Sequence, residues 1–440
     1  MTTSSLDARR QRRTRLLAQM QAAGGGVAVI PTAPERVRSR DSHYSYRSDS
    51  YFHYLCGFPE PEAVLVLVAG DTPQSLLFCR DKNAEREVWE GFRYGPETAA
   101  AAFALDAAYS LGQLDEKLQE LLGGQQTLWY SLGYDAEFDA RISRCLNALR
   151  AQVRSGKRAP SVLHDVRASL DAMRLCKDAG EVALMRRAAD ISAAAHRRAM
   201  RAARPGRYEY QIEAELLCEF RAAGSQYPAY TSIVAGGASA CVLHYVDNNR
   251  LLRDGELLLI DAGCEFDGYA SDITRSFPVN GRFSGAQADV YEMVLAAQAA
   301  AIAAIRPGAD FEQVHQAALA VIVRGLIDLK LLAGSVDGVI EAESYKRFYM
   351  HRTSHWLGMD VHDVGDYKDG EQWQRLAPGM VLTVEPGCYI RAADDVPEAF
   401  HDIGVRIEDD ALVTADGCDI LSAAAPKNIA DIEALMHDGR

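Results

Sequence analysis

Two aspartates near the middle of the chain have the spacing of residues that hold a cation. Residues 257–260 are an apolar run that predicts a buried strand ending on Asp261, and Asp267-Gly268 is a strong turn signal before a second strand. With an even number of loop residues, Asp261 and Asp272 lie on one face of this hairpin. At about 4 Å and an effective dielectric near 20 they repel by roughly 4 kcal/mol. A metal ion between them would remove the repulsion, although two solvated aspartates beside a turn would show the same spacing.

Acidic and imidazole side chains further along the chain extend this candidate metal site. Glu385 ends a second apolar run, and Glu408 ends an alternating apolar stretch that also carries Arg406. His351 and His355 would share one face of a helix, but a lone histidine is more often a surface residue than a ligand. Together the candidates supply four carboxylates and at least one imidazole. This set suits two divalent ions such as manganese, cobalt or zinc, and does not suit a thiolate zinc site.

The elements that must position these residues repeat within the second half of the chain. The order Arg-Pro-Gly, an aromatic residue with glutamate, and then a helix occurs at residues 204–209 and again at 306–312. Gly255 precedes Asp261 by six residues, and Gly379 precedes Glu385 by six residues, with an apolar run in between. Chance similarity of two alanine-rich helices is the alternative, but the matched strand ends favour an internal two-fold pseudosymmetry. We expect a curved sheet that is covered by helices on its outer face and carries the site on its concave face.

The N-terminal part of the chain is predicted to form a smaller α/β domain. Apolar strands at residues 27–30, 62–69 and 75–80 alternate with helical stretches, including one near 115–122. The polar segment 150–160 is the best candidate linker, and we place the boundary near Leu175, with domains at 1–175 and 176–440. The arginine-rich segment 4–21 has the pattern of a capped surface helix, which we favour over an organelle transit peptide.

Composition excludes several classes of protein. The chain has 440 residues, of which 48% are hydrophobic and 25% charged, as in an ordinary soluble globular protein. The formal net charge of −14 argues against binding to nucleic acid, and no apolar run approaches the roughly 18 residues that a membrane span needs. Nine cysteines without C-x-x-C spacing indicate reduced thiols and a cytoplasmic location.

An ordered series of motifs along nearly the whole chain resembles the aminopeptidase P family, within the creatinase and methionine aminopeptidase superfamily. The motifs are YRSDSYFHYLCGFPEP (46–61), RDKNAER (80–86), LHY (243–245), IDAG (260–263), GYASDITR (268–275), SHWLG (354–358), DVHD (360–363), VEPG (384–387) and VRIE (405–408). The resemblance implies a pita-bread catalytic domain after the N-terminal domain. It also implies two bound metal ions, usually manganese, on Asp261, Asp272, His355, Glu385 and Glu408.

The resemblance further implies hydrolysis of the bond between an N-terminal residue and a following proline. This bond needs a dedicated pocket, because its nitrogen carries no hydrogen and the ring blocks extended backbone contacts. Two divalent ions can hold a bridging water, lower its pKa towards about 7 and polarise the carbonyl. We expect Glu385 to take the proton of that water, His362 to donate to the carbonyl oxygen, His244 to assist the proline nitrogen and His351 to line the ring pocket. Arg406 is expected to steady the carboxylates, and Tyr389 to lie in the same substrate-binding or supporting group.

Three alternatives remain open on the sequence. Prolidase has the same ligands but accepts only dipeptides, and methionine aminopeptidase lacks so large an N-terminal domain. A metal-free peptide-binding module on the same fold would have lost ligands, and no ligand position is missing here.

The resemblance also implies an assembly of identical chains. We expect a homodimer or homotetramer, in which a neighbour's N-terminal residues approach the active site, and Trp89 is the candidate residue for that contact. A solitary tryptophan is also often only a packing residue. The expected substrates are peptides with a free N-terminus and proline in second position.

Overall fold

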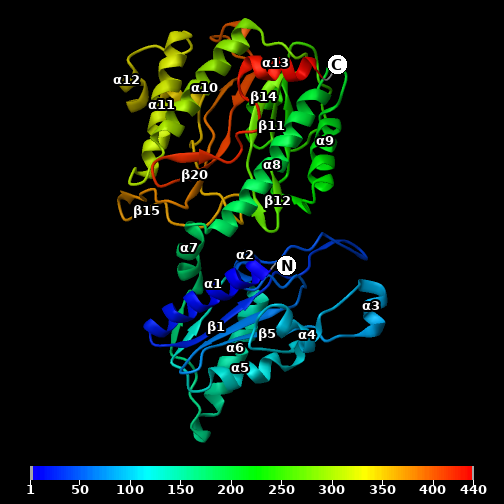
Figure 1. The fold of residues 1–440 in the computed structure, drawn as a ribbon. Coiled ribbons are helices and arrows are strands. Elements are labelled where there is room, and N and C mark those ends of the chain that lie inside the picture. The colour runs from blue at the N-terminus through cyan, green and yellow to red at the C-terminus, as the bar shows by residue number, and fades with distance from the viewer. Residues whose placement is uncertain (1–2, 439–440) are drawn as a thin grey trace. The chain divides into compact units, whose positions relative to one another are not determined.

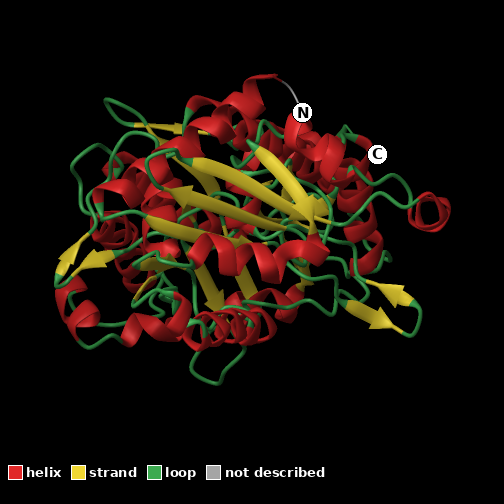
Figure 2. Cartoon of the chain, turned by 90° about the horizontal axis from the view of Figure 1, so that it is seen from below, coloured by secondary structure: helices red, strands yellow, loops and turns green. Residues whose placement is uncertain are grey.

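The computed structural model describes residues 3–438 and divides the chain into two compact units, residues 1–173 and 174–440 (Figure 1). Helices and strands occur together in the chain, so the predicted α/β class is confirmed (Figure 2). No helix of the described residues is long and apolar enough to span a lipid bilayer.

The N-terminal unit contains a six-stranded sheet in the order β6-β5-β4-β1-β7-β8. Its strands are β1 (Gly26–Pro31), β4 (Val64–Ala69), β5 (Gln74–Cys79), β6 (Ala107–Ser110), β7 (Thr127–Trp129) and β8 (Val162–His164), and a separate hairpin pairs β2 (Val37–Ser39) with β3 (Ser42–His43). The helices are α1 (Thr3–Ala22), α2 (Ser50–Leu55), α3 (Ala84–Glu90), α4 (Gly95–Ala102), α5 (Leu114–Leu122) and α6 (Ala136–Ala151). The boundary between the two units, after Met173, lies within α7 (Val166–Leu175). The predicted first helix and the predicted strands β1, β4 and β5 are therefore confirmed.

Helix α5 shows why this unit folds as its sequence predicts. Leu114, Leu118 and Leu122 recur every four residues, so they form one stripe that is fully buried against the sheet. The predicted linker at residues 150–160 is wrong. Strand β8 follows it and pairs in parallel with β7, so this polar segment is a loop inside the unit.

The C-terminal unit has its strands in several short sheets. The candidate carboxylate ligands lie at or beside the strand ends of two of them, β10-β11-β14 and β17-β20-β21. The strands are β9 (Tyr227–Pro228), β10 (Ile233–Gly236), β11 (Leu257–Asp261), β12 (Cys264–Phe266), β13 (Tyr269–Ala270), β14 (Thr274–Pro278), β15 (Lys368–Asp369), β16 (Gln372–Trp373), β17 (Val381–Val384), β18 (Gly387–Ile390), β19 (Ile403–Arg406), β20 (Asp409–Val413) and β21 (Cys418–Ile420). The helices are α8 (Ala179–Ala202), α9 (Glu209–Ala222), α10 (Gly285–Ala304), α11 (Phe311–Asp328), α12 (Val336–Glu341) and α13 (Ile429–His437).

The predicted hairpin is present, but it is built from two short ladders. Strands β11 and β14 pair antiparallel with Asp261 opposite Thr274, and the inner strands β12 and β13 turn at Asp267-Gly268, both of which have positive φ. The ladders are separated where the backbone of Gly263 lies against Ser271. A Cβ on Gly263 would come within 1.7 Å of the Ser271 carbonyl oxygen, so only glycine fits there.

The predicted internal repeat is confirmed by matching backbone hydrogen bonds. The Arg-Pro-Gly loop after α8 bonds to residues 250–252, and the loop after α10 bonds in the same way to residues 374–376. The matching N–H to O=C bonds are Gly206 to Leu252 and Gly308 to Leu376, Glu209 to Arg250 and Phe311 to Gln374, and Leu252 to Arg207 and Leu376 to Ala309. In this alignment Phe311 corresponds to Glu209, so the predicted match of Phe311 with Tyr208 is wrong by one residue. The two loops are aligned by their backbone hydrogen bonds and not by their aromatic side chains.

Candidate metal centre

A cavity of about 700 Å³ in the C-terminal unit is lined by all five predicted metal ligands. The predicted substrate-facing histidines and Arg406 line the same cavity, and Phe311, Tyr367 and Trp373 add aromatic surface to its wall. The predicted ligands are Asp261 at the end of β11, Asp272 before β14, His355 in a loop, Glu385 after β17 and Glu408 between β19 and β20. Both pseudo-symmetric halves therefore supply carboxylates to one cavity.

The two aspartates that the hairpin carries are joined by a tyrosine hydroxyl. The Oη of Tyr230 lies 2.6 Å from Oδ1 of Asp261 and also contacts Oδ1 of Asp272. A hydroxyl has one proton and donates to one of these oxygens at a time, so the other contact joins two oxygen acceptors. The sequence did not single out Tyr230, because its segment carries no periodic pattern or motif that distinguishes it.

The remaining predicted ligands approach Asp272 from the second half of the repeat. His355 Nε2 lies 3.4 Å from Asp272 Oδ2 and 3.5 Å from Glu385 Oε1. One ligand atom from each of Asp272, His355 and Glu408 lies within 4.8 Å of the other two. Residues 349–367, all of which the structure describes, contain no helix, so the predicted helical pairing of His351 with His355 is wrong. The loop instead positions His355 through its Nδ1, which lies 2.9 Å from the carbonyl oxygen of Trp356.

Burial and the crowding of negative charge shift the pKa values of four of the candidate ligands. Burial raises the pKa of Asp261, and Asp272 adds to the effect while Arg406 opposes it. Burial also raises the pKa of Glu385 to about 7, and burial together with Asp272 and Glu385 raises that of Glu408 well above its usual value. Burial opposes the charged form of His355, but its partner Asp272 and the charge of Glu385 outweigh this and raise its pKa to about 9. All four shifts would be reversed by added positive charge, and the oxygen-rich donor set fits hard or borderline divalent ions.

Arg406 connects the carboxylates to the predicted substrate side of the cavity. Its Nη2 donates to Asp261 Oδ2 at 2.6 Å, its Nη1 donates to the Tyr389 hydroxyl at 2.9 Å, and its Nε donates to the Thr274 hydroxyl at 3.1 Å. The Tyr389 oxygen lies 2.8 Å from His351 Nε2. Burial, with the charge of Arg406, lowers the pKa of His351 to about 3, so this imidazole is neutral near pH 7.

The loop that carries His362 is held by a buried ion-pair cluster. Asp363 accepts from Arg174 Nη2 at 2.6 Å and from Lys177 Nζ at 2.9 Å, and all three side chains are 1% exposed. The N–H of Asp363 also donates to the carbonyl oxygen of Trp356. His362 itself is exposed, and its ring centroid lies 4.2 Å from that of His355. His244 is likewise exposed on the cavity wall.

Trp89, the remaining predicted site residue, lies on helix α3 of the N-terminal unit and is 83% exposed. It is not among the residues that line the cavity, within the part of the chain that the structure describes. Val88 and Phe92 beside it are also exposed.

Helix α8 supports the end of β11 through a fully buried histidine. His196 Nε2 lies 2.9 Å from the carbonyl oxygen of Ala262, the residue after Asp261. Burial lowers the pKa of His196 to about 4, whereas an unfolded histidine titrates near 6.5. Between about pH 4 and pH 6.5, His196 is therefore protonated in the unfolded chain but neutral in the folded protein. The free energy of unfolding decreases as the pH falls from about 6.5 towards 4.

This difference predicts a measurable pH effect. Between pH 7 and pH 5, we expect the wild-type protein to lose about 2 kcal/mol more unfolding free energy than His196→Gln does. Urea unfolding at both pH values measures the difference, with a chelator present so that metal loss does not contribute. His401→Gln is the control, because this histidine, half-buried on the same unit, also contacts a carbonyl oxygen. Equal losses in wild type and His196→Gln would contradict the assignment.

Comparison with known proteins finds matches along nearly the whole chain. Residues 183–415 match the family described as metallopeptidase family M24, and residues 9–129 match the aminopeptidase P N-terminal domain. The Xaa-Pro aminopeptidase of Escherichia coli strain K12 is 44% identical over 429 residues, which are 97% of this chain and 96% of that protein.

Solved structures agree with these matches. Aminopeptidase PepP of Pseudomonas aeruginosa is 48% identical with a TM-score of 0.97, and the match covers 99% of this chain and 98% of the other. Structures of Escherichia coli aminopeptidase P include a zinc-substituted form in complex with product, which is 43% identical with a TM-score of 0.96 and covers 99% of both chains.

Proposed function

The chain belongs to metallopeptidase family M24 and is a metallo-exopeptidase of the Xaa-Pro aminopeptidase type, and on this premise we propose that its five clustered ligands bind two divalent ions. Its substrates are peptides with a free N-terminus and proline in second position. The observation that supports this most is the convergence of Asp261, Asp272, His355, Glu385 and Glu408 on one cavity with three histidines on its wall. Four carboxylates nearly neutralise two divalent ions, and the oxygen-rich set favours Mn²⁺, with Co²⁺ or Zn²⁺ as alternatives.

Two bound ions would supply an activated water and polarise the scissile carbonyl. Glu385 accepts the proton of the attacking water, since its carboxylate lies within the cluster and 3.5 Å from His355. His362 donates to the carbonyl oxygen as that oxygen becomes negative, because the imidazole is exposed in the cavity beside His355. His244 assists the departing proline nitrogen from the same wall.

His351 lines the ring pocket, and Tyr389, which is buried and is not among the described residues that line the cavity, orients it together with Arg406. The chain of contacts from His351 Nε2 to the Tyr389 hydroxyl and on to Arg406 fixes the imidazole orientation, and Arg406 also holds Asp261. These linked hydrogen bonds support a role in which the three residues fix the position of the proline pocket relative to the carboxylates.

A panel of short peptides tests the substrate assignment. We expect a Xaa-Pro-Xaa tripeptide to lose only its first residue when Mn²⁺ is present, and a matched Xaa-Ala-Xaa tripeptide to stay intact. Mass spectrometry of the products distinguishes the outcomes. Cleavage of Xaa-Pro dipeptides alone would instead identify a prolidase, and a purified protein that binds no metal and cleaves nothing would indicate a peptide-binding module.

Two further features of the proposal concern assembly and location. The apolar surface of Val88, Trp89 and Phe92, which are 82%, 83% and 64% exposed, supports a homodimer or homotetramer in which Trp89 contacts a neighbouring chain. All nine cysteines lie in the described part of the chain and are free thiols, which supports a cytoplasmic location.

A further inference from the structure

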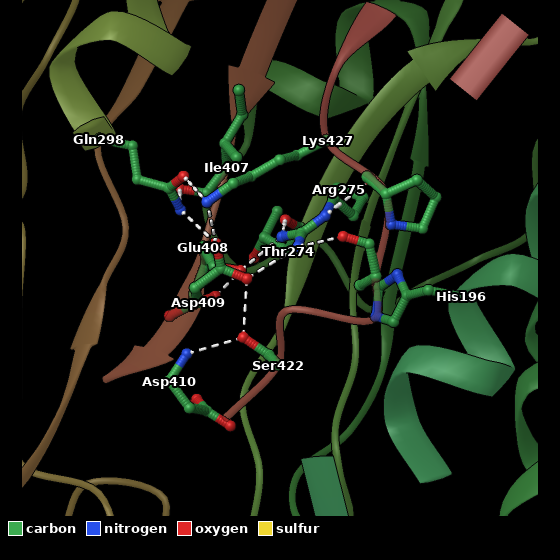
Figure 3. A network of polar contacts seen from close by, with 12 residues as sticks. His196, Thr274, Arg275, Gln298, Ile407, Glu408, Asp409, Asp410, Ser422 and Lys427 are labelled. Atoms are coloured by element: carbon green, nitrogen blue, oxygen red, sulfur yellow. Dashed lines mark hydrogen bonds and ion pairs between the residues drawn. The ribbon is translucent and has the colours of Figure 1, made fainter. Parts of the chain in front are cut away.

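A second buried charge cluster contacts the strands that carry the proposed metal ligands. Its members, the Arg275 cluster, are Arg275, Gln298, Asp409, Ser422 and Lys427 (Figure 3). They are not among the residues that line the cavity in the described part of the chain, so they have no direct contact with a substrate there.

The guanidinium of Arg275 is fully buried and all of its donors are used. Its Nη2 donates to Asp409 Oδ1 at 2.7 Å and to the carbonyl oxygen of Ala425 at 2.9 Å. Its Nη1 donates to the carbonyl oxygens of Thr274 and Glu408, and its Nε donates to that of Pro426 at 3.0 Å. Arg275 therefore holds three backbone segments together, at Thr274, at Glu408 and at residues 425–426.

The carboxylate of Asp409 is the centre of the cluster. Besides Arg275, Oδ1 accepts from the Ser422 hydroxyl at 2.7 Å, and Oδ2 accepts from Lys427 Nζ at 2.7 Å and from Gln298 Nε2 at 3.1 Å. Asp409 is fully buried, so loss of one cationic partner leaves its charge less well compensated.

The Arg275 cluster bonds to the backbone of one proposed ligand and of the residue before a second, and it reaches a third through Asp410. Arg275 holds the carbonyl of Glu408 at 2.6 Å, and Gln298 Nε2 lies 3.2 Å from the carbonyl oxygen of Val384, the residue before Glu385. Ser422 accepts from the N–H of Asp410, whose carboxylate accepts in turn from the N–H of Asp272. These ligands belong to both halves of the repeat, so the cluster connects the two halves close to the ligands.

Two of the five cluster residues come from the segment that precedes the C-terminal helix. Ser422, Lys427 and the carbonyls of Ala425 and Pro426 belong to the segment 421–428, which connects β21 to the C-terminal helix α13. The carbonyl of Lys427 also accepts from the Tyr291 hydroxyl at 2.7 Å, and α13 buries Ile432 and Met436. We define residues 421–428 as the C-terminal clamp.

We propose that the C-terminal clamp, through Lys427 and the Arg275 cluster, positions the ligand carboxylates and thereby raises the affinity of the centre for divalent metal. This inference rests on the proposed metal centre. Lys427 is the positioning residue that can be tested most cleanly, because its side chain is 29% exposed and its removal leaves no large cavity. A purely structural ion pair would instead change stability without changing metal affinity.

The test measures the Mn²⁺ dissociation constant of chelator-stripped protein by competition with a chelating indicator. We expect Lys427→Met to raise this constant about tenfold, as loss of a group that supports metal ligands does, and Lys427→Arg to restore most of the affinity. At saturating Mn²⁺, KM for a Xaa-Pro tripeptide should stay at the wild-type value. The control is Lys117→Met in the N-terminal unit, which removes a half-buried lysine, 31% exposed, that pairs with Glu120 at 2.8 Å.

The thermal midpoint of the stripped protein separates this role from a structural one. A Lys427→Met protein with a lowered thermal midpoint but an Mn²⁺ dissociation constant within twofold of wild type would contradict the proposed role of the C-terminal clamp in metal affinity. Ser422→Ala, which removes one hydroxyl from the same cluster, is the second variant if Lys427→Met does not fold, and the same two outcomes apply to it. A wild-type protein that binds no Mn²⁺ would overturn the proposed metal centre and the clamp with it.

Discussion

Replacing Glu385 by alanine is expected to lower kcat/KM by roughly 10³-fold and to remove metal at the same time. The reason is its double role. The carboxylate follows β17 directly, lies 3.5 Å from His355 Nε2 and faces the same cavity as Asp261 and Asp272. Glu385 is proposed both to bind an ion and to accept the proton of the attacking water. The neighbouring carboxylates cannot take over these roles, because each of them is itself a proposed metal ligand.

The measurement pairs turnover of a Xaa-Pro tripeptide with metal content of the purified protein. Asp395→Ala is the matched control, because it removes an exposed carboxylate of the same unit that pairs with Arg347 at 2.6 Å. The control should keep wild-type activity and metal. A Glu385→Ala protein that retains both ions and half of its activity would show that the double role is wrong.

Replacing His362 by alanine is expected to lower kcat by about 10²- to 10³-fold while metal content stays unchanged. The imidazole is proposed to donate to the carbonyl oxygen of the scissile bond, and its ring faces His355 at 4.2 Å without being one of the clustered ligands. The ion pairs of Asp363 with Arg174 and Lys177 keep the loop in place in the variant, so the loss reports on the missing donor.

His401→Ala is the control for this second prediction, since His401 is a half-buried histidine of the same unit whose Nε2 contacts the carbonyl oxygen of Val396. Single-turnover rates at saturating Mn²⁺, together with the metal content of each protein, give the comparison. A loss in kcat of less than tenfold with full metal content would exclude the proposed role of His362 at the carbonyl oxygen.

Local patterns in the sequence determined the elements that deliver the candidate ligands. The apolar run that becomes β11, the Asp267-Gly268 turn and the glycine spacing before Asp261 and Glu385 are all short-range features, because burial and turn geometry depend on neighbouring residues. The repeat could be predicted for the same reason, since each half carries its own copy of the pattern. The ordered motifs then indicated the family.

Local patterns failed where a residue's role depends on distant partners. The segment 150–160 has the composition of a linker, but the sheet continues after it through β8. His351 and His355 have helical spacing, but the loop around them takes its hydrogen bonds from elsewhere, including a bond from Glu385 N–H to the carbonyl of Thr353. Polar loops and short histidine spacings carry no periodic signal, so only their tertiary partners decide their structure.

The sequence by itself determined which carboxylates end which strands, and therefore which side chains were candidates for a metal. Only the tertiary structure decided what surrounds them: the Tyr230 hydroxyl between Asp261 and Asp272, the contact of Arg406 with both Asp261 and Tyr389, and the C-terminal clamp on Arg275. These are hydrogen bonds between single polar groups far apart in the chain. Such bonds follow from the packing of whole elements, and one side chain at one position leaves no repeating pattern from which its partner could be predicted.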